Sequence, residues 1–320
     1  MSLAPHVATL GRGPGRSRSL TFAEAADAMR VMLSGEAAPE AIGALLMLLR
    51  MKGETAEEIA GFASAARGSL DGGLQPCLDW PSYAAGRSRG RPWFLLAARL
   101  VAQSGHRVLL HGWNGSGAPV RAHLADAGIP MARTLPDAAS ALDRNGIAYL
   151  PLECLHPALL RLLALREVFG LRSCINTVCR MLNPGRARAG VQGVFHPSYR
   201  QLQTAAARHM GWPDLTVIKG GGGEFERHPG KAVTAVGLRK GRDIAKDHPA
   251  RIDGSGRLAE GPAPATTVAT LWRGTASDSF AEAAVVGTAA LALETLGVSR
   301  PEALACRLWE SRSVNDAEAA

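Results

Sequence analysis

Apolar residues recur every three or four positions in the first quarter of the chain, which is the spacing of an amphipathic helix. Two segments open with a threonine and carry a glutamate three positions later, Thr21 with Glu24 and Thr55 with Glu58. This is the capping-box pattern, in which the two side chains satisfy free N–H groups at the start of a helix. The pattern predicts a helix after each threonine.

A proline and several glycines indicate where these helices begin and end. Pro39 opens a helix between the other two, and Gly53 closes it. Three short amphipathic helices with short links predict a helical domain over residues 20–72. Residues 1–19 are polar, basic and rich in glycine, so we expect them to form a flexible basic arm.

From residue 73 onward, short apolar runs alternate with helical segments. The runs are typical of β-strands because they are short, rich in branched side chains and bounded by glycine or proline. The predicted strands are 107–110, 147–152, 191–195, 215–219 and 231–238. The predicted helices are 93–105, 137–145, 156–170, 173–182, 197–210, 279–296 and 301–309.

This alternation predicts an α/β sheet domain made of two pieces of the chain, 73–154 and 185–320. We expect the helices of residues 155–184 to join the helical domain. Residues 240–264 are charged and rich in glycine and proline, and we expect a long loop there.

The run from Gly105 to Gly128 places a strand, a glycine-rich turn and a helix start next to one another. We expect the helix to begin at Ser116, with Pro119 in its first turn. Unpaired N–H groups and the positive end of the helix dipole point outward at such a turn, so it can hold a phosphate. The run matches neither G-x-G-x-x-G nor G-x-x-x-x-G-K-[ST], and an ordinary strand-to-helix turn is the alternative.

Composition narrows the class of protein. Of the 320 residues, 47% are hydrophobic and only 20% are charged, which predicts a folded chain with a large core. There is no apolar run of membrane-spanning length and no signal-peptide pattern, so we expect a cytoplasmic protein that does not enter a membrane. The five scattered cysteines contain no C-x-x-C pair, which favours buried reduced thiols over a metal site.

Positive charge is concentrated in the second half of the chain. The net charge is +8, and residues 186–251 hold 12 Lys or Arg against 5 Asp or Glu. This distribution favours a basic surface for partners that carry phosphate. The alternative is a bias in composition, because 31 of the 36 basic residues are arginines.

Several strings occur in the order found in one known family. They are MKGETAEEIAGF, VLLHGWNGSGAPVRAHLADAGI, HPALLRLLALREVFGLRSCINTVCRMLNP and VQGVFHPSY. Over nearly its whole length the chain resembles the anthranilate phosphoribosyltransferase fold of glycosyltransferase family 3. The resemblance implies a small N-terminal helical domain and a larger α/β domain with a central mixed sheet, the nucleoside phosphorylase and phosphoribosyltransferase class. It also implies transfer of a phosphoribosyl group from phosphoribosyl pyrophosphate (PRPP) to an aromatic acceptor, with magnesium.

The residues that match the family's donor site depart from its pattern. Its GTGGD phosphate loop falls on residues 83–87, which keep one glycine and lose the acid. In its KHGN string, leucine and tryptophan replace the lysine and the asparagine, while His111 and Gly112 remain. Its acidic metal pair is reduced to Glu224 and Glu226 in GGGGEFERHP. Without such groups, a charge that develops during transfer loses much of its stabilisation.

These losses, the basic arm and the charged loop make the chain similar to the YbiB-type, or second-type, branch of anthranilate phosphoribosyltransferase-like proteins. That resemblance implies a homodimer that binds nucleic acid and lacks the parent activity. We therefore expect a DNA-binding homodimer rather than an enzyme, with no cofactor, metal or catalytic residue, that contacts phosphates with little sequence selectivity. The expected contacts are Arg186, Arg188, Arg200, Arg208, Arg227, Lys231, Arg239, Lys240, Arg242 and Lys246.

The alternative function is a phosphoribosyl or other glycosyl transferase that uses PRPP and Mg with an unidentified acceptor. In this hypothesis arginines replace glycine N–H groups around the pyrophosphate, and an arginine retained from the family holds an acceptor carboxylate. The expected site residues are Gly86, Arg87, Arg89, Arg91, His111, Gly112, His156 and Arg166.

Overall fold

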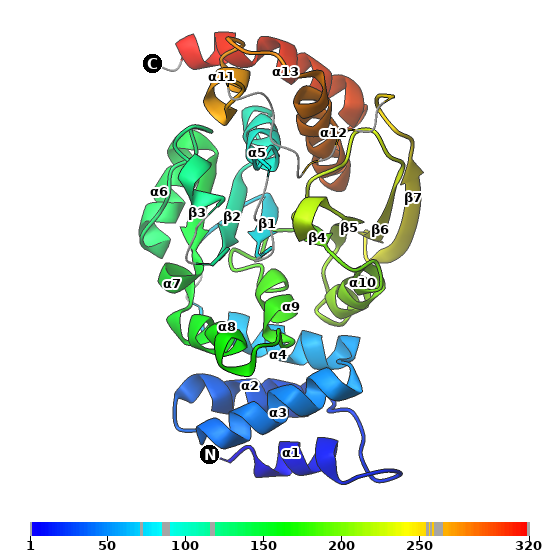
Figure 1. The fold of residues 1–320 in the computed structure, drawn as a ribbon. Helices are drawn as coiled ribbons and strands as arrows, with labels where there is room; N and C mark the ends of the chain where they lie inside the picture. Colours follow the sequence, from blue (N-terminus) through cyan, green and yellow to red (C-terminus); the bar gives the residue numbers. More distant parts are fainter. Residues whose placement is uncertain are drawn as a thin grey trace.

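A computed structural model gives the fold of the chain (Figure 1). A helical layer at the N-terminus lies below a larger α/β part built on one sheet, and the last helices lie on the far side of that sheet. The structure describes residues 2–70, 73–84, 90–115, 119–253, 256, 258 and 265–318.

Four helices form the N-terminal layer, and both predicted capping boxes are present. The Thr21 hydroxyl accepts a hydrogen bond from the Glu24 N–H at 3.3 Å, and the Thr55 hydroxyl accepts one from the Glu58 N–H at 3.2 Å. In each box the glutamate also accepts from the N–H of its threonine. The helices are α1 (Ala4–Gly11), α2 (Phe22–Ser34), α3 (Pro39–Lys52) and α4 (Ala56–Gly68).

The prediction of a flexible arm over residues 1–19 is wrong. Helix α1 forms within this stretch and packs against α3 and α2. Leu3 and Leu10 are only 2% and 5% exposed, and the His6 Nε2 atom lies 2.9 Å from Asp27 Oδ2. Two leucines and one histidine are enough to anchor a helix that the surrounding polar residues concealed in the sequence.

The sheet has seven strands in the order β3-β2-β1-β4-β5-β6-β7. Neighbouring strands are parallel from β3 to β5, and β6 and β7 are added antiparallel at one edge, so the predicted α/β class with a mixed sheet is confirmed. The strands are β1 (Leu78–Ser82), β2 (Val108–Gly112), β3 (Ile147–Pro151), β4 (Ala189–Val194), β5 (Asp214–Lys219), β6 (Val233–Arg239) and β7 (Arg242–His248).

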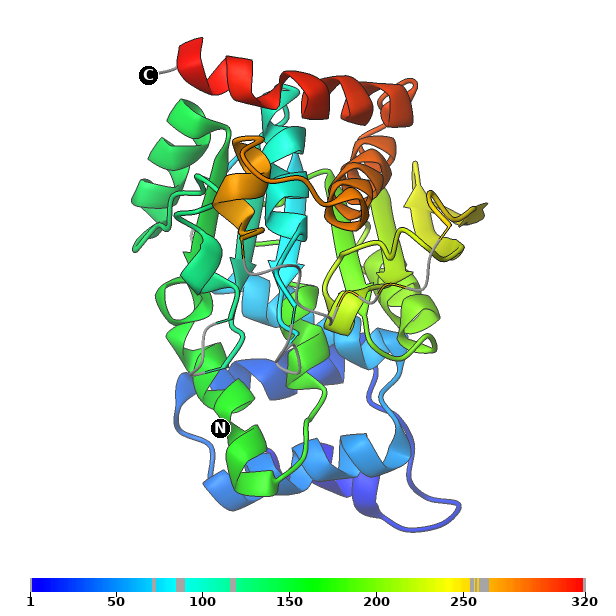
Figure 2. The same ribbon diagram turned by 45° about the horizontal axis from the view of Figure 1, so that its top comes forward.

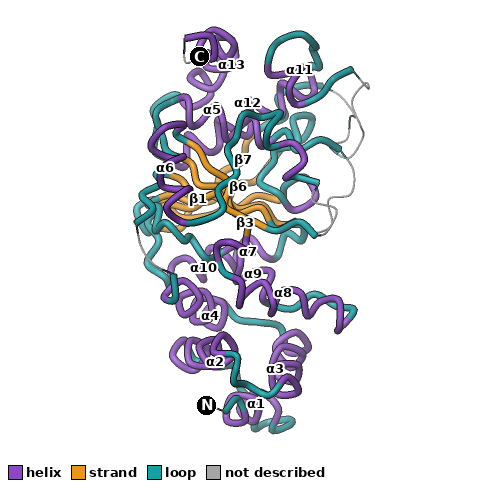
Figure 3. Tube along the Cα trace, turned by 90° about the vertical axis from the view of Figure 1, so that its left-hand side faces the viewer, coloured by secondary structure: helices purple, strands orange, loops and turns teal. Residues whose placement is uncertain are grey.

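Helices cover both faces of the sheet (Figures 1 and 3). Helices α5, α11, α12 and α13 lie on one face, while α10 and the N-terminal layer lie toward the other. On the first face Trp80 packs edge-on against Phe225, with 5.3 Å between ring centroids. The helices are α5 (Phe94–Gln103), α6 (Leu135–Asn145), α7 (Leu152–Leu155), α8 (Pro157–Phe169), α9 (Ile175–Arg180), α10 (Tyr199–His209), α11 (Val268–Trp272), α12 (Ser279–Thr295) and α13 (Pro301–Glu318).

The helix predicted after the glycine-rich turn is not formed. Ser116 lies outside the described residues, and residues 119–128 contain only the short 3₁₀ turn η1 (Arg121–His123). Tertiary contacts hold this irregular segment: Arg121 pairs with Glu153 at 2.7 Å, and Arg99 donates to the Ala127 carbonyl at 3.0 Å. The turn therefore offers no helix N-terminus for a phosphate.

None of the helices in the described part of the chain has the length and apolar character that a membrane span requires. The tilted view in Figure 2 shows instead a layered arrangement in which α8 and α9 connect the N-terminal layer to the sheet. A cavity between the helical layer and the sheet is lined by residues of both.

Candidate functional site

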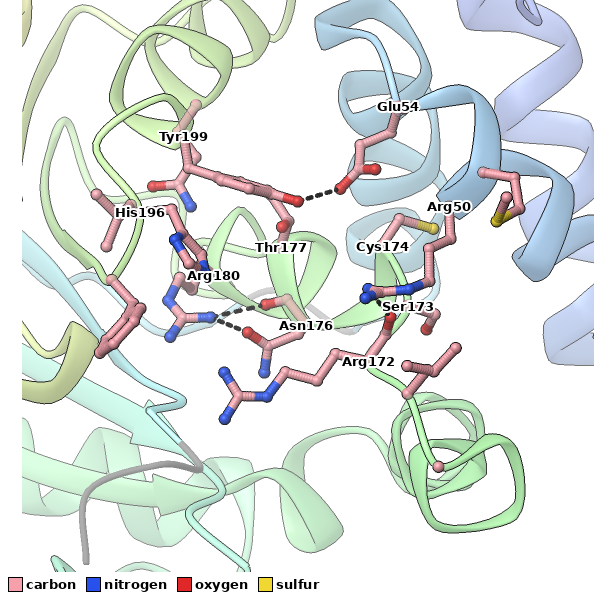
Figure 4. A pocket seen from close by; sticks show the side chains of 17 residues that line it. Arg50, Glu54, Arg172, Ser173, Cys174, Asn176, Thr177, Arg180, His196 and Tyr199 are labelled. Atoms are coloured by element: carbon pink, nitrogen blue, oxygen red, sulfur yellow. Dashed lines mark hydrogen bonds between the residues drawn. The ribbon is translucent and has the colours of Figure 1, made fainter.

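A cavity of about 710 Å³ opens between the N-terminal layer and the carboxyl end of β4 (Figure 4). Its walls come from the end of α3, the turn between α8 and α9, helix α9, the residues that follow β4, and helix α10. Ligands of α/β proteins bind at the carboxyl ends of parallel strands, so this position is the expected one for a substrate.

Three arginines line the cavity. Arg50 comes from α3, Arg172 from the α8–α9 turn and Arg180 from α9. The Arg50 guanidinium donates to the Arg172 carbonyl, which ties the helical layer to the turn. None of the three forms an ion pair with a carboxylate among the residues that the structure describes. This side of the cavity is therefore positively charged and suited to an anion.

Arg180 is the most buried of the three, with 8% of its surface exposed. Its guanidinium donates to the backbone carbonyl of Asn176 at 3.2 Å and also to the Asn176 side-chain oxygen. Burial lowers the pKa of Arg180, although the more distant Glu224 carboxylate opposes this effect. A buried cation that has only neutral hydrogen-bond partners gains strongly from a bound anion.

A carboxylate and a phenol lie elsewhere on the cavity wall. The Tyr199 hydroxyl donates to Glu54 Oε1 at 3.1 Å, as Figure 4 shows. Burial, reinforced by the Glu54 charge, raises the pKa of Tyr199 to about 12. Glu54 is the one carboxylate among the described lining residues. The cavity thus has a cationic part and a smaller part that can accept a hydrogen bond from an amine.

Apolar side chains surround the cavity entrance. Met51, Leu171 and Phe195 are 84%, 47% and 60% exposed, which is unusual for large hydrophobic residues. A ring or another flat apolar group placed among them would remove this surface from water. The lining therefore fits a ligand that combines an apolar body with a negative group.

Arg166, which the sequence analysis proposed for an acceptor carboxylate, lies close to the cationic part of the cavity. Its guanidinium sits over the Trp113 ring, 5.5 Å from the centroid. Burial is the main cause that lowers the pKa of Arg172, and the nearby charge of Arg166 is the second cause. Arg166 is not one of the cavity-lining residues, so it adds to the local positive potential rather than to the wall.

The two histidines of the alternative hypothesis have structural roles. His156 caps α8, since its Nδ1 atom accepts from the Leu159 N–H at 3.3 Å, and its Nε2 atom lies 3.0 Å from the Ser69 hydroxyl. His111 is completely buried on β2, with Nδ1 2.8 Å from the Tyr83 hydroxyl and Nε2 3.2 Å from Asp79 Oδ1. Both rings are enclosed by protein and neither lines the cavity, so their assignment to a substrate site stays a prediction.

The remaining residues of that hypothesis either lie outside the described residues or do not line the cavity. Gly86, Arg87 and Arg89 lie outside the described residues. Gly112 ends β2 in register with Ser82 of β1. Arg91 precedes α5 and is half-buried, and it does not line the cavity.

The basic residues predicted to bind nucleic acid do not all face solvent. Arg227 is 3% exposed and donates to the Pro249 carbonyl, and burial lowers its pKa to about 10. Arg239 donates to the Leu215 carbonyl at 2.9 Å and to the Thr216 hydroxyl at 2.7 Å. Arg227 ties the segment after η2 to the residues that follow β7, and Arg239 ties β6 to β5, so both guanidinium groups are engaged within the protein.

Others among the ten are paired with acidic side chains of the same chain. Arg208 pairs with Asp243, Lys246 with Glu294 at 2.9 Å, and Arg188 with Asp214 at 3.6 Å. The Arg200 guanidinium on α10 donates to the Thr234 carbonyl at 2.9 Å. Lys231, Lys240, Arg242 and Arg186 are exposed.

Sequence reasoning missed the residues that line the cavity. Arg172 stands in the GLRS string that supported the family resemblance, and Arg50 directly precedes the helix-ending MKG. Arg180 lies on a helix that was predicted as a structural element only. Each arginine belongs to a different element, so only the fold brings them together.

Comparison with known proteins identifies the family. A model of the helical bundle domain of the glycosyl transferase family matches residues 6–70. Anthranilate phosphoribosyltransferase 2 of Streptomyces coelicolor is 30% identical over 230 residues, covering 70% of this chain and 69% of that protein. The chain belongs to the anthranilate phosphoribosyltransferase family. Further anthranilate phosphoribosyltransferases match as well. The protein of Geobacillus stearothermophilus is 29% identical over 230 residues, which cover 70% of this chain and 67% of that protein. The protein of Methanosphaerula palustris is 30% identical over 205 residues, which cover 62% of this chain and 60% of that protein.

Solved anthranilate phosphoribosyltransferases share the fold. The enzyme from Thermus thermophilus superposes with a TM-score of 0.81 at 22% identity, over 99% of this chain and 95% of that one. The Saccharomyces cerevisiae enzyme in complex with PRPP and Mg gives 0.75 at 17% identity, over 99% and 96%. The resemblance to glycosyltransferase family 3 is thus confirmed at the level of the family.

The prediction of a DNA-binding protein that is not an enzyme is wrong. The relatives of this anthranilate phosphoribosyltransferase family member are enzymes, and nothing in these comparisons indicates DNA binding. The structure gives a physical reason, because much of the positive charge that suggested a polyanion is buried or paired.

The residues that match the family's metal pair do not fit a magnesium ion as they are placed. Glu224 and Glu226 are 1% and 0% exposed, and both carboxylates accept hydrogen bonds from the protein. Within the described ranges, no group of three or more His, Cys, Asp or Glu side chains is placed to hold a metal ion. As placed here, both carboxylates act as hydrogen-bond acceptors of the protein.

Proposed function

We propose that the chain is a glycosyltransferase that moves a phosphoribosyl or related pentosyl group onto an acceptor carrying a negative charge. The acceptor binds in the cavity between the helical layer and the sheet. The observation that carries the proposal is Arg180, a buried cation at the cavity wall with neutral partners only. Membership of a family of phosphoribosyltransferases supports group transfer as the reaction class.

The lining supports an aromatic amino acid-like acceptor such as anthranilate. The carboxylate would pair with the arginines, because a guanidinium binds a carboxylate through two parallel hydrogen bonds. The amine would lie toward Glu54, and the ring would contact Phe195 or Met51. Arg50 and Arg172 orient the acceptor in this proposal, and the burial of Arg180 strengthens its contact with the carboxylate.

Two finer assignments remain part of the proposal. Within the family, the loss of the lysine and the asparagine beside His111 supports placement in the YbiB-type branch, and the proposed transfer reaction departs from the inactivity that this resemblance implies. The homodimer that this resemblance implies stays a prediction. PRPP with Mg is the first donor to test, because a structural neighbour binds both, although Glu224 and Glu226 are not arranged as metal ligands.

The proposal is tested with anthranilate as the probe acceptor. Calorimetry should show binding to the wild-type chain that Arg180→Met weakens and the exposed control Arg161→Met does not. Incubation with millimolar PRPP and Mg should then give a phosphoribosylated product, detected by mass spectrometry. Equal binding by both variants, or no product from any aromatic carboxylate tested, would contradict the proposal.

A further inference from the structure

A second cavity, of about 460 Å³, lies at the other end of the parallel strands from the Arg180 cavity. Cys77 and Arg107 lie on its wall directly before β1 and β2. Ala189 and Asp214, the first residues of β4 and β5, lie on it too. Since β1, β2, β4 and β5 run parallel, this cavity is at their amino ends, separated from the Arg180 cavity by the length of β4, about 17 Å. The described residues that line the two cavities do not overlap.

Positive charge exceeds negative charge on the wall of the second cavity. Its described lining residues include three arginines and one carboxylate, Asp214. Arg188 lies 3.6 Å from Asp214. Arg107 lies 3.2 Å from Asp143, which is outside the cavity. The third, Arg186, has no ion-pair or hydrogen-bond partner for its guanidinium in the part of the chain that the structure describes, so this group is available to an anion.

A tight turn before β4 fixes the position of Arg186. Its backbone has φ 52°, a left-handed conformation that residues other than glycine rarely adopt. The Asn183 side chain holds the turn, because it accepts from the Ala187 N–H and donates to the Ala187 carbonyl, both at 2.8 Å. A Cβ atom on Gly185 would lie 2.4 Å from Cδ of Pro76, so the turn packs closely against the residues before β1. The chain thus maintains a costly backbone conformation that places Arg186 at the cavity.

A fourth arginine lies near the second cavity. Arg67, in the last turn of α4, is not one of the lining residues. Burial is the main cause that lowers the pKa of Arg67, and the charge of Arg186 is the second cause, while the Asp79 carboxylate opposes both. The two guanidinium groups therefore repel each other, and an anion bound beside them would relieve this repulsion.

We propose that the second cavity binds a small phosphate ester. A phosphate group carries about two negative charges and three acceptor oxygens, which suits arginines that arrive from different elements. Gln75 and Asp214 can accept hydrogen bonds from hydroxyl groups of the ester, and Pro76 and Leu296 give an apolar wall. The volume admits a molecule larger than the phosphate itself.

A ligand in the second cavity does not take part in the proposed transfer reaction. Reacting ligands of parallel sheets bind at the carboxyl ends of the strands, whereas this cavity lies at the amino ends. The turn that carries Arg186 connects α9, which holds Arg180, to β4. The second cavity is therefore a separate binding site joined to the first by one short segment of chain.

The test measures the binding of glycerol 3-phosphate and of inorganic phosphate to the full chain by calorimetry. Arg186→Asn removes the charge, and asparagine adopts the left-handed conformation more readily than most residues, so the turn is retained. We expect Arg186→Asn to weaken the binding of the ester about fivefold. Arg300→Asn is the matched control, because Arg300 is exposed, has the same φ of 52° and does not line the cavity.

A second measurement locates the bound ester. Cys77 lines the cavity and is half-buried, so the ester should slow its alkylation by iodoacetamide, as followed by peptide mass mapping. Cys154 is half-buried on α7 outside the cavity, and its alkylation rate should not change. Should Arg186→Asn melt at a much lower temperature than the wild-type chain, Arg188→Gln removes another of the three charges and gives the same comparison.

Four outcomes would each overturn the proposal. They are the absence of binding, equal weakening by Arg186→Asn and Arg300→Asn, an unchanged alkylation rate at Cys77, and an ester that binds no more tightly than inorganic phosphate. Neither measurement uses a donor or an acceptor, so the result does not depend on whether the proposed transfer reaction occurs.

Discussion

Replacing Arg180 by methionine should weaken the binding of an anionic ligand without lowering the stability of the chain. Methionine is unbranched and flexible, and it replaces the aliphatic part of the arginine by an apolar side chain without a charge. The backbone carbonyl of residue 180, which accepts from the Gln192 amide at 2.9 Å, is unaffected. The change therefore removes the charge of Arg180 while leaving the link between α9 and β4.

The size of each effect follows from the burial of the guanidinium. A hydrogen bond to a charged group contributes about 1.5–3 kcal/mol, so an anionic ligand should lose about 10-fold to 150-fold in affinity. Without a ligand, the buried charge is stabilised only by Asn176 and by a more distant carboxylate. Removing this charge also removes the cost of its burial, so we expect the free energy of unfolding without ligand to be unchanged or increased.

Both quantities can be measured on the same preparation. Anthranilate binding is followed by calorimetry, and the free energy of unfolding by urea denaturation without ligand. We expect weaker binding of anthranilate to Arg180→Met, with unfolding free energy unchanged or increased. A loss of about 2 kcal/mol or more in stability would mean that Arg180 is a structural residue, and would refute the reasoning.

Three further predictions concern stability and reactivity. Glu58→Ala should lower the free energy of unfolding in urea by about 3–5 kcal/mol, because Glu58 is completely buried and pairs with Lys52. Glu24→Ala in the exposed capping box should lower it by only about 1 kcal/mol. Equal losses would contradict this prediction. A hydrogen bond from Arg18 lowers the pKa of Glu24 to about 2. The stability that this ionised carboxylate contributes above pH 4.5 should therefore disappear as the pH falls toward 2. Arg18→Gln should flatten this part of a curve of unfolding free energy against pH. Burial raises the pKa of the Cys174 and Cys179 thiols, so a thiol reagent at pH 8 should label these two only after unfolding, as located by peptide mass mapping; rapid labelling of either one in the native chain would refute this.

The elements that the sequence predicted are those whose signals are local. The capping boxes at Thr21 and Thr55 and the apolar strand β3 depend on neighbours in the chain, and all three form as predicted. Strand β1 has the sequence LDWPS, in which a buried aspartate and a proline interrupt the apolar pattern. Strand β7 is charged because it lies at the sheet edge, and was predicted as loop.

The site was less predictable than the fold because its parts are far apart in the sequence. Arg50 and Arg180 meet at one cavity only after α3 and α9 have packed around the sheet. Charge counting pointed instead to Arg227 and Arg239, which the fold buries. The net charge of a sequence does not show which charged side chains are buried or paired, because the tertiary structure determines this.

The cavity lies where α3 of the helical layer meets α9 and α10 beside the sheet. A ligand that contacts Arg50 on one layer and Arg180 on the other bridges them, and unfolding must first release it. At a concentration one hundred times its dissociation constant, such a ligand raises stability by about 2.7 kcal/mol. The natural acceptor can therefore be sought by measuring the melting temperature of the purified chain with candidate compounds. A compound that contacts both layers will raise this temperature.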